Sequence, residues 1–566
     1  MVDTTAHDDA EVTSIFNNTV GNTDLFKTDS TYKNVGCMEL NQFVLDGSFD
    51  TTPNSYTVPF WSIRKSEADC TFINNPSLLV TFDDAHTSSG ITLSFLGDYP
   101  VEILVSWYYD SEYQVKIDTK RFYPNSTNFF CNNQVENYKA VKIEFVKTRL
   151  PKQYVKGTFI LYGQILTWSN TDVISATVNE ETDVTSATIP INTAELTLID
   201  EDNQFNVQNA DGIWKSLQGT QRVVITEDIN GTEIDVGTFY IDKWESKENA
   251  ITITAFDSVG LIDRAKFMGG MYTDAPVGIL IQQIMASADY SDYEIDEELA
   301  EITLSGYLPI MSCREALQQI AFAIGAVVDC SRGSAIRVYV PDRNVDSYIL
   351  KDRKFSGTAV VTLDEYISGV SVTCSKYNPL DEYTEVFSGE LEKGIHRIEF
   401  SEPYQALNCE GADIVESSVN YAVIDVADNG EVAINGMGYE KTEYTVSKDV
   451  TAIEVGQVAK VKAFSGLTLY NMQILSKVVA QLLSWYSLRQ KMTIEYICES
   501  EKVGEWVGVQ DSIKASMFAI TRINSQKIDL TGGYLATADC RGYSSIVSTY
   551  AYMGNNEMIM NGEELI

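Results

Sequence analysis

Side chains that could serve as acid–base groups or metal ligands are scarce in this sequence. It contains three histidines, His7, His86 and His396, and none lies in a metal-binding or nucleophile motif. The patterns Gly-x-Ser-x-Gly, His-Glu-x-x-His and Gly-x4-Gly-Lys-Ser/Thr do not occur. The stretch 83–86, Asp-Asp-Ala-His, has the residue types of a weak cation site, but a solvated acidic loop is the simpler interpretation. We therefore predict no catalytic, cofactor-binding or metal-binding residue.

Carboxylates are abundant, and glycoside hydrolysis uses a pair of them. The sequence has 80 Asp and Glu residues, so spacing alone cannot select a pair. Most acidic residues of the first predicted β-region fall on the polar phase of strands or in turns; the region contains Glu39, Asp46, Asp83, Asp98, Glu102 and Glu144. We predict that the chain is not an enzyme, with a glycoside hydrolase carrying accessory β-domains as an alternative.

Aromatic residues gather around one predicted strand end. Trp107, Tyr108, Tyr109 and Tyr113 lie there, and further aromatic residues follow at 122–123 and 129–130. Exposed aromatic rings can stack on sugars, whereas buried rings pack the core of a β-sandwich. These four residues are the candidate carbohydrate contacts, for example to a host surface polysaccharide, and core packing is the alternative.

The charge balance argues against nucleic-acid binding. The formal net charge is −39, and tight binding to a phosphate backbone needs Lys and Arg. An acidic surface instead suits a channel through which DNA slides. The basic residues that could contradict this interpretation by lining such a channel are Arg314, Arg332, Arg337, Arg489, Arg522 and Arg541.

The cysteines and the termini indicate where the chain is made. Nine cysteines occur without any Cys-x-x-Cys, which is typical of scattered reduced thiols rather than of disulfides or a zinc site. The N-terminus is polar and acidic, unlike a secretory signal. No run of 18 apolar residues predicts a transmembrane helix. We expect synthesis in a cytoplasm.

The elements that position these residues are mainly strands. Short alternating segments fill 37–163 and 174–263, and a further β-region covers 345–465. Asn230–Gly231 predicts a hairpin turn, and so do Asn429–Gly430 and Asn435–Gly436.

Three helices are predicted among the strands. Asp274 is expected to cap the first, with Pro276 in its first turn. Ser312 and Glu315 form a capping box for the second, which Gly325 is expected to end. The third covers about 472–490.

One sequence pattern occurs twice. Phe239-x-Ile241 and Ser246 recur as Phe518-x-Ile520 and Ser525, and each set is followed by Thr-Ala and Asp-x-x-Gly. The pattern predicts two related β-domains around the helical region.

The helical region resembles a small α+β domain of phage tail hub proteins, found in siphophage tail tips and in contractile baseplates. The likeness rests on the helix after Asp274, on 304–309 (Leu-Ser-Gly-Tyr-Leu-Pro), on 314–321 (Arg-Glu-Ala-Leu-Gln-Gln-Ile-Ala) and on 325–328 (Gly-Ala-Val-Val). The strands at 90–95, 141–145 and 159–163 are similar to those of galactose-binding-like sandwiches attached to some such proteins.

The resemblance implies a multidomain fold that is mainly β with α+β. The implied domains are a polar segment at 1–30, a galactose-binding-like β-sandwich at 31–163, a first hub β-barrel at 164–268, a small α+β domain with two helices at 269–345, a β-rich domain at 346–466, a helix with the second hub barrel at 467–545 and a C-terminal tail at 546–566. We expect neither the C-terminal fibre nor the lytic domain that some siphophage tail-tip proteins carry.

The resemblance also implies a structural virion protein, a homotrimeric hub at the distal end of the tail that gates the DNA channel. Its partners would be the distal tail or tube protein, the tape-measure protein, and tail fibre or receptor-binding proteins. Two barrels in each of three subunits would match a sixfold tail tube. A carbohydrate-binding adhesin of the tail tip is the first alternative to this function.

Overall fold

A computed structural model gives the structure of the chain. It describes residues 4–15, 19, 21–27, 34–35, 39, 49–50, 58–163, 166–209, 212, 214, 217, 219–229, 232–342, 344–355, 357, 359–453, 455–512, 514 and 517–546. Asp46, the predicted turn at Asn230–Gly231 and the tail from 547 onward lie outside these residues. The chain forms two compact units, Met1–Ser169 with Gln204–Gln221 (unit 1) and Asn170–Asn203 with Arg222–Ile566 (unit 2).

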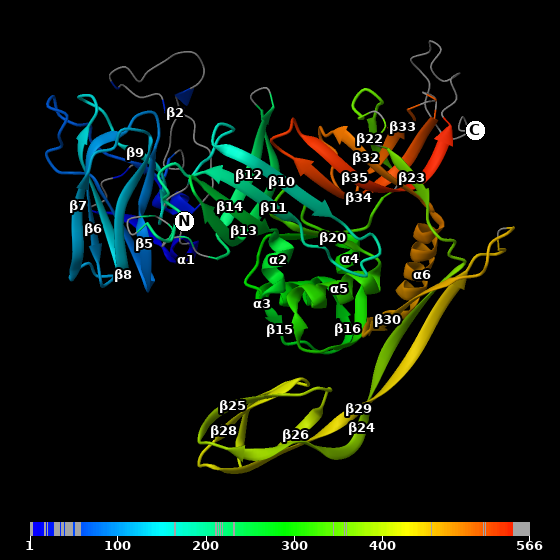
Figure 1. Cartoon of the computed structure of the whole chain (residues 1–566). Helices are drawn as coiled ribbons and strands as arrows, with labels where there is room; N and C mark the ends of the chain where they lie inside the picture. Colours follow the sequence, from blue (N-terminus) through cyan, green and yellow to red (C-terminus); the bar gives the residue numbers. More distant parts are fainter. Residues whose placement is uncertain are drawn as a thin grey trace. The chain divides into compact units, whose positions relative to one another are not determined.

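Unit 1 is built on a seven-stranded sheet in the order β4-β9-β5-β8-β6-β7, with β1 paired to β5. Its elements are α1 (Thr4–Asp9), β1 (Glu11–Ser14), η2 (Thr23–Lys27), β2 (Asn34–Val35), β3 (Phe49–Asp50), β4 (Phe60–Trp61), β5 (Ser77–Phe95), β6 (Pro100–Tyr108), β7 (Lys116–Phe122), β8 (Asn128–Thr148) and β9 (Lys156–Leu161). The strands are coloured blue to cyan in Figure 1. Because β5 and β8 are long and irregular in register, each pairs with several neighbours along its length.

The core of unit 1 is aromatic and β-branched. Phe60, Phe82, Trp107 and Phe145 belong to one buried cluster, which the alternation of apolar residues predicts. A buried ion pair lies at its edge, where Lys156 Nζ is 2.7 Å from Glu39 Oε2 and both side chains are almost fully buried. The backbone N–H of Tyr154 donates to the other Glu39 oxygen. The burial of an acidic residue is therefore compensated by a cation and a hydrogen bond.

Unit 2 contains an eleven-stranded sheet in the order β12-β13-β14-β11-β10-β34-β35-β32-β23, with β33 beside β34 and β22 beside β33. The strands are β10 (Val173–Glu181), β11 (Thr193–Ile199), β12 (Arg222–Ile229), β13 (Thr232–Lys247), β14 (Ala250–Phe256), β22 (Val345–Ile349), β23 (Val360–Leu363), β32 (Gln490–Ile497), β33 (Trp506–Gln510), β34 (Met517–Asp529) and β35 (Leu535–Ile546). Ile229 of β12 pairs with Thr232 of β13, so these two strands form a hairpin.

A helical subdomain lies between the two ends of this sheet in sequence. It contains α2 (Ser258–Asp263), β15 (Lys266–Phe267), β16 (Gly270–Pro276), α3 (Val277–Ser287), β17 (Tyr293–Ile295), α4 (Glu297–Ala300), β18 (Thr303–Leu308), β19 (Met311–Ser312), α5 (Cys313–Ile324), β20 (Val327–Asp329) and β21 (Ile336–Tyr339). β31 (Leu469–Tyr470) and α6 (Met472–Ser487) follow later in the chain. Leu317 of α5 and Leu475 of α6 share one buried cluster, so α6 packs on this subdomain.

The helix ends test the predicted capping chemistry. The Ser312 hydroxyl accepts from the Glu315 N–H and the Glu315 carboxylate accepts from the Ser312 N–H, which confirms the capping box. Gly325 ends α5 in the left-handed conformation, as predicted. The prediction for Asp274 was wrong, because this residue lies within β16 and its carboxylate accepts from the Ser305 hydroxyl.

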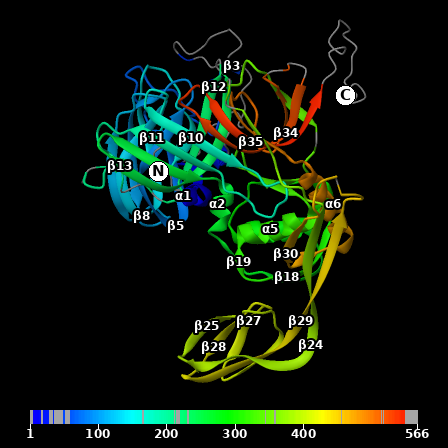
Figure 2. The same cartoon turned by 45° about the vertical axis from the view of Figure 1, so that its right-hand side comes forward.

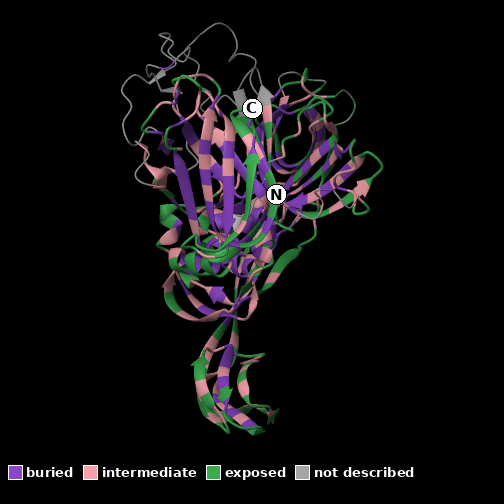
Figure 3. Cartoon of the chain, turned by 90° about the vertical axis from the view of Figure 1, so that its left-hand side faces the viewer, coloured by how far each residue is buried: buried purple, intermediate pink, exposed green. Residues whose placement is uncertain are grey.

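A long hairpin leaves the helical subdomain. Its strands are β24 (Gly369–Leu391) and β29 (Gly430–Asp449), with β30 (Val461–Leu467) beside β24. The connection carries β25 (Gly394–Glu399), β26 (Gln405–Glu410), β27 (Asp413–Ser417) and β28 (Tyr421–Val426), which lie at the far end of the hairpin (Figures 1 and 2). Asn435–Gly436 is paired within β29 and makes no turn, contrary to the prediction. Figure 3 shows exposed and intermediate residues along much of the hairpin.

One asparagine ties this far end to the helical subdomain. Asn420 is fully buried. Its amide nitrogen donates to the carbonyls of Met268, at 2.7 Å, and Leu308, at 3.0 Å. Its amide oxygen accepts from the Tyr307 hydroxyl at 2.7 Å. Gly269 has a φ of +65°, and a Cβ there would lie 2.6 Å from the Asn420 amide nitrogen, so glycine allows this close approach.

The fold as a whole confirms a multidomain protein that is mainly β with α+β.

Candidate functional site: the junction of two sheet repeats

The eleven-stranded sheet contains the same five-stranded arrangement twice. One half has the order β12-β13-β14-β11-β10 (repeat 1), and the other has the order β33-β34-β35-β32-β23 (repeat 2). Strands in corresponding places follow one another in the same chain order, and every neighbouring pair within both halves is antiparallel. Repeat 2 is interrupted in sequence between β23 and β32 by the long hairpin and α6. The order and direction of the strands indicate an internal duplication.

A β-bulge aligns the two repeats residue by residue. In β13 the pairing with β14 shifts between Ile241 and Lys243, and in β34 the pairing with β35 shifts between Ile523 and Ser525. Superposing the bulges places Ala255 on Cys540, and following the ladders places Ala194 on Met492. The members of each aligned pair are buried in both repeats. At these two aligned positions the repeats share burial but not the residue type.

The recurring sequence pattern marks corresponding strands but not corresponding residues. Phe239 and Phe518 lie on β13 and β34, as the prediction of two related β-domains requires. The bulge alignment, however, places Phe239 on Thr521.

The two repeats join edge to edge. The second half of β34 pairs with β10, with Glu181 opposite Ser525 and Thr177 opposite Asp529. The first half of the same edge of β34 pairs with β33. Val178 is fully buried at this joint and faces Ile528. We call the β10–β34 pairing, together with the polar network below, the junction.

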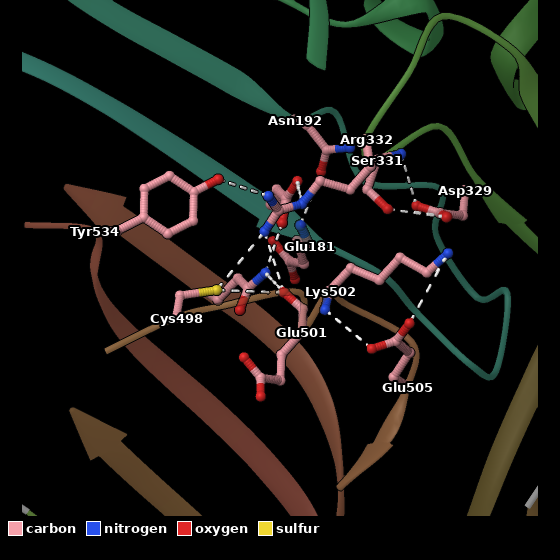
Figure 4. A network of polar contacts seen from close by, with 12 residues as sticks. Glu181, Asn192, Asp329, Ser331, Arg332, Cys498, Glu501, Lys502, Glu505 and Tyr534 are labelled. Atoms are coloured by element: carbon pink, nitrogen blue, oxygen red, sulfur yellow. Dashed lines mark hydrogen bonds and ion pairs between the residues drawn. The ribbon is translucent and has the colours of Figure 1, made fainter. Parts of the chain in front are cut away.

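A buried ion pair forms the centre of the junction, and Figure 4 shows Arg332 of this pair among the surrounding polar groups. Arg332, from the turn between β20 and β21, has its Nε 3.1 Å from Glu180 Oε1 on β10. Its two terminal nitrogens donate to the Tyr534 hydroxyl at 3.0 Å and to the Glu501 carbonyl at 3.1 Å. One arginine therefore contacts repeat 1, the loop before β33 and the turn before β35.

Neutral and charged groups extend this network. Gln526 of β34 donates to Glu180 Oε2 at 2.7 Å and accepts from the Tyr496 hydroxyl at 3.1 Å. The carboxylate of Glu501 accepts from Arg353 at 2.8 Å. Burial raises the pKa of Glu180, although the positive charge of Arg332 opposes this shift. Burial lowers the pKa of Arg332, but Glu180, Tyr534 and Cys498 together outweigh this effect, so that pKa is raised overall.

The network also reaches the helical subdomain. Asp329 of β20 accepts from Arg337 at 2.6 Å and from the Ser331 hydroxyl at 3.0 Å. These bonds hold the β20–β21 turn that carries Arg332. The junction therefore connects repeat 1, repeat 2 and the helical subdomain through one hydrogen-bonded polar network.

The predicted carbohydrate contacts are divided between core and surface. Trp107 and Tyr108 are buried, whereas Tyr109 and Tyr113 are exposed. Tyr108 and Tyr113 contact each other with their ring centroids 6.2 Å apart. The rings left for contact with a sugar are therefore those of Tyr109 and Tyr113, and the binding itself stays a prediction.

The other residues considered from the sequence have structural partners. His86 Nε2 lies 2.9 Å from Asp9 Oδ2, and the backbone N–H groups of Asp83 and Asp84 donate to the same carboxylate. Among the described residues, no group of three or more His, Cys, Asp or Glu side chains is placed to hold a metal ion. No helix within the described ranges is long and apolar enough to cross a membrane.

The arginines that could have lined a channel are largely engaged within the chain. Arg522 and Arg541 are buried, and burial lowers the pKa of Arg522. Arg314 and Arg337 pair with Asp263 and Asp329. Arg541 pairs with Asp364, whose backbone carbonyl accepts from Arg489. The sequence predicts Arg332 only as a possible channel residue, because its partner Glu180 is distant in sequence.

No protein-family model matches the sequence, and no curated protein matches it. Among solved structures, the chain is similar to a tail protein from Neisseria meningitidis MC58, with 11% identity, 65% of this chain and 92% of that chain covered, and a TM-score of 0.39. It is also similar to the 43 kDa tail protein of prophage MuSo2 from Shewanella oneidensis, with 12% identity, coverage of 65% and 93%, and a TM-score of 0.36. For prophage tail protein gp18 from Listeria monocytogenes EGD-e, the identity is 9%, the coverage is 67% and 90%, and the TM-score is 0.36. Each of these three structures is that of a tail protein.

Proposed function

We propose that this chain is a structural protein of a phage tail, a hub at the distal end that joins the tail tube to the tip. The observation that carries the proposal is the duplicated sheet of unit 2. Two repeats that join edge to edge give one chain two copies of the same building block. The resemblance of the helical subdomain to hub proteins, stated from residues 274–328, supports the same assignment.

The hub acts as a mechanical adaptor and not as an enzyme. A homotrimer would place six sheet repeats around an axis, which matches a sixfold tube. Heterologous contacts between copies close into a ring when the rotation per copy allows it. Such a ring surrounds a channel, which the hub closes before ejection and opens for the tape-measure protein and DNA.

The charge of the chain fits a conduit that DNA passes without binding. The formal net charge is −39, and the arginines considered above are buried, paired or bonded within the chain. Each phosphate paired with Lys or Arg would add affinity and slow passage. In this proposal, the protein is assembled in the host cytoplasm and leaves as part of the virion.

A negative-stain image of the purified protein tests this function. The hub predicts rings with a central hole. Discrete single-chain particles, together with absence of the protein from purified tails, would contradict it and favour the adhesin alternative, for which Tyr109 and Tyr113 are the exposed aromatic residues.

A further inference from the structure

We propose that β23 of one copy pairs with residues 243–247 of β13 in a second copy, in the register that β10 and β34 use within the chain. The inference rests on the ring-forming role proposed above and names the surface that makes the ring. Corresponding strand edges are paired in one repeat and unpaired in the other.

One edge of repeat 2 accepts a strand of repeat 1. In repeat 2, the edge of β34 beyond the bulge, residues 525–529, pairs with β10. In repeat 1, the corresponding residues of β13 are 243–247. β12 pairs with β13 only from Thr232 to Tyr240, and no described strand pairs with this edge of β13 beyond the bulge.

The strand that docks on this edge within the chain is β10. The ladders place β10 of repeat 1 on β23 of repeat 2, with Asn179 on Thr362. β23 is the last strand of the sheet and pairs only with β32 among the described strands. Among the described strands, one docking strand and one accepting edge thus have no partner.

The exposure of whole residues also differs between the docked strand β10 and its counterpart β23. Val178 at the joint is 0% exposed, whereas its counterpart Val361 is 55% exposed. Glu180 is 2% exposed, whereas its counterpart Leu363 is 73% exposed, and the adjacent Val360 is 57% exposed. An exposed apolar edge strand promotes association unless something covers it. The composition of β23 therefore suits a covered strand better than a free one.

The internal joint fixes the register between copies. Transferring it pairs Val360 with Lys247, Val361 with Ser246, Thr362 with Glu245 and Leu363 with Trp244. Leu363 then packs beside an aromatic ring, a favourable cross-strand pair. The contact is heterologous, since β23 of one copy meets β13 of the next, so it builds a ring or an open chain of copies.

Disulfide trapping tests the register directly. A copy carrying Thr362→Cys is mixed with a copy carrying Glu245→Cys, under mild oxidation. Directly opposed residues of antiparallel strands have Cα atoms roughly 5 Å apart, within disulfide reach. We expect a covalent dimer only in the mixture, with each variant alone and the wild type as backgrounds. Replacing the second variant with Glu248→Cys shifts the site by about 10 Å along the strand and should abolish the product.

Charge on the docking strand gives the second test. We expect Val361→Lys with Leu363→Lys to lower self-association at least tenfold, measured by sedimentation, without changing the thermal unfolding of the chain. The matched control is Val455→Lys with Val458→Lys, since these valines are also exposed, at 104% and 82%.

The outcomes separate this inference from the proposed function. A ring that survives the lysine pair and forms no Thr362–Glu245 disulfide overturns the inference and leaves the hub role standing. A chain that forms the disulfide but is absent from tails overturns the hub role alone. A monomer at every concentration with no disulfide overturns the inference outright.

Discussion

Replacing Arg332 with methionine should destabilise unit 2 more than any other single change at the junction. The substitution keeps an apolar stem but removes the cation beside Glu180, whose side chain is 1% exposed. At an effective dielectric constant of about 20, opposite charges ~3 Å apart attract by roughly 5 kcal/mol. The hydrogen bonds to Tyr534 and Glu501 add to the loss.

The expected cost is about 3–5 kcal/mol, the usual range for breaking a buried pair on one side. Urea unfolding followed by intrinsic fluorescence measures it, as a lower midpoint for the transition of unit 2. Glu180→Gln in the same chain removes the stranded charge and keeps an acceptor for Gln526, so the double variant should recover at least half of the loss.

A matched control is Lys266→Met, which breaks an ion pair with Glu399 that is about half exposed. Exposed pairs contribute roughly 0–1 kcal/mol. If Arg332→Met costs no more than this control, or if the double variant is as unstable as the sum of its singles, the reasoning about the junction is refuted.

Three further predictions concern other parts of the chain. Burial raises the pKa of Asp257 to about 6, so the folded chain holds the proton of this carboxyl group more tightly than the unfolded chain does. The stability that results is complete below about pH 4 and is lost as the pH rises through 6. Wild type should lose roughly 2–3 kcal/mol between pH 4 and 7 from this group, and unfolding of Asp257→Asn across that range should lack this loss. Asn420→Leu leaves two carbonyls and a hydroxyl without their partner and should raise protease sensitivity at residues 399–421, with no such change for the exposed Ile395→Leu. If unit 1 binds sugar, Tyr109→Ala with Tyr113→Ala should abolish retention on polysaccharide columns while its melting is unchanged; equal retention of the variant and wild type would exclude these rings.

Local chemistry was predictable from sequence, and long-range pairing was not. The Ser312–Glu315 capping box and the Gly325 helix end depend on neighbouring residues, so the sequence shows them. The prediction for Asp274 was wrong because an aspartate can occur both at a helix cap and within a strand. The pairing of β16 with β18 places Asp274 in a strand.

The sequence shows the duplication within unit 2 only in part, and the reason is physical. Corresponding positions need the same burial and not the same side chain, so Ala194 corresponds to Met492, and Phe239 to Thr521. Likewise, Arg332 and its partner Glu180 are far apart in sequence, and they meet only in the folded chain.

The number of copies in the assembled protein decides whether the chain forms the proposed hub. Native mass measurement of the purified chain at high concentration, together with cross-linking in intact particles, counts the subunits. We expect a species of three times the 63.1 kDa of one chain, because three copies with two repeats each would complete a ring of six. A strict monomer in both measurements would contradict it.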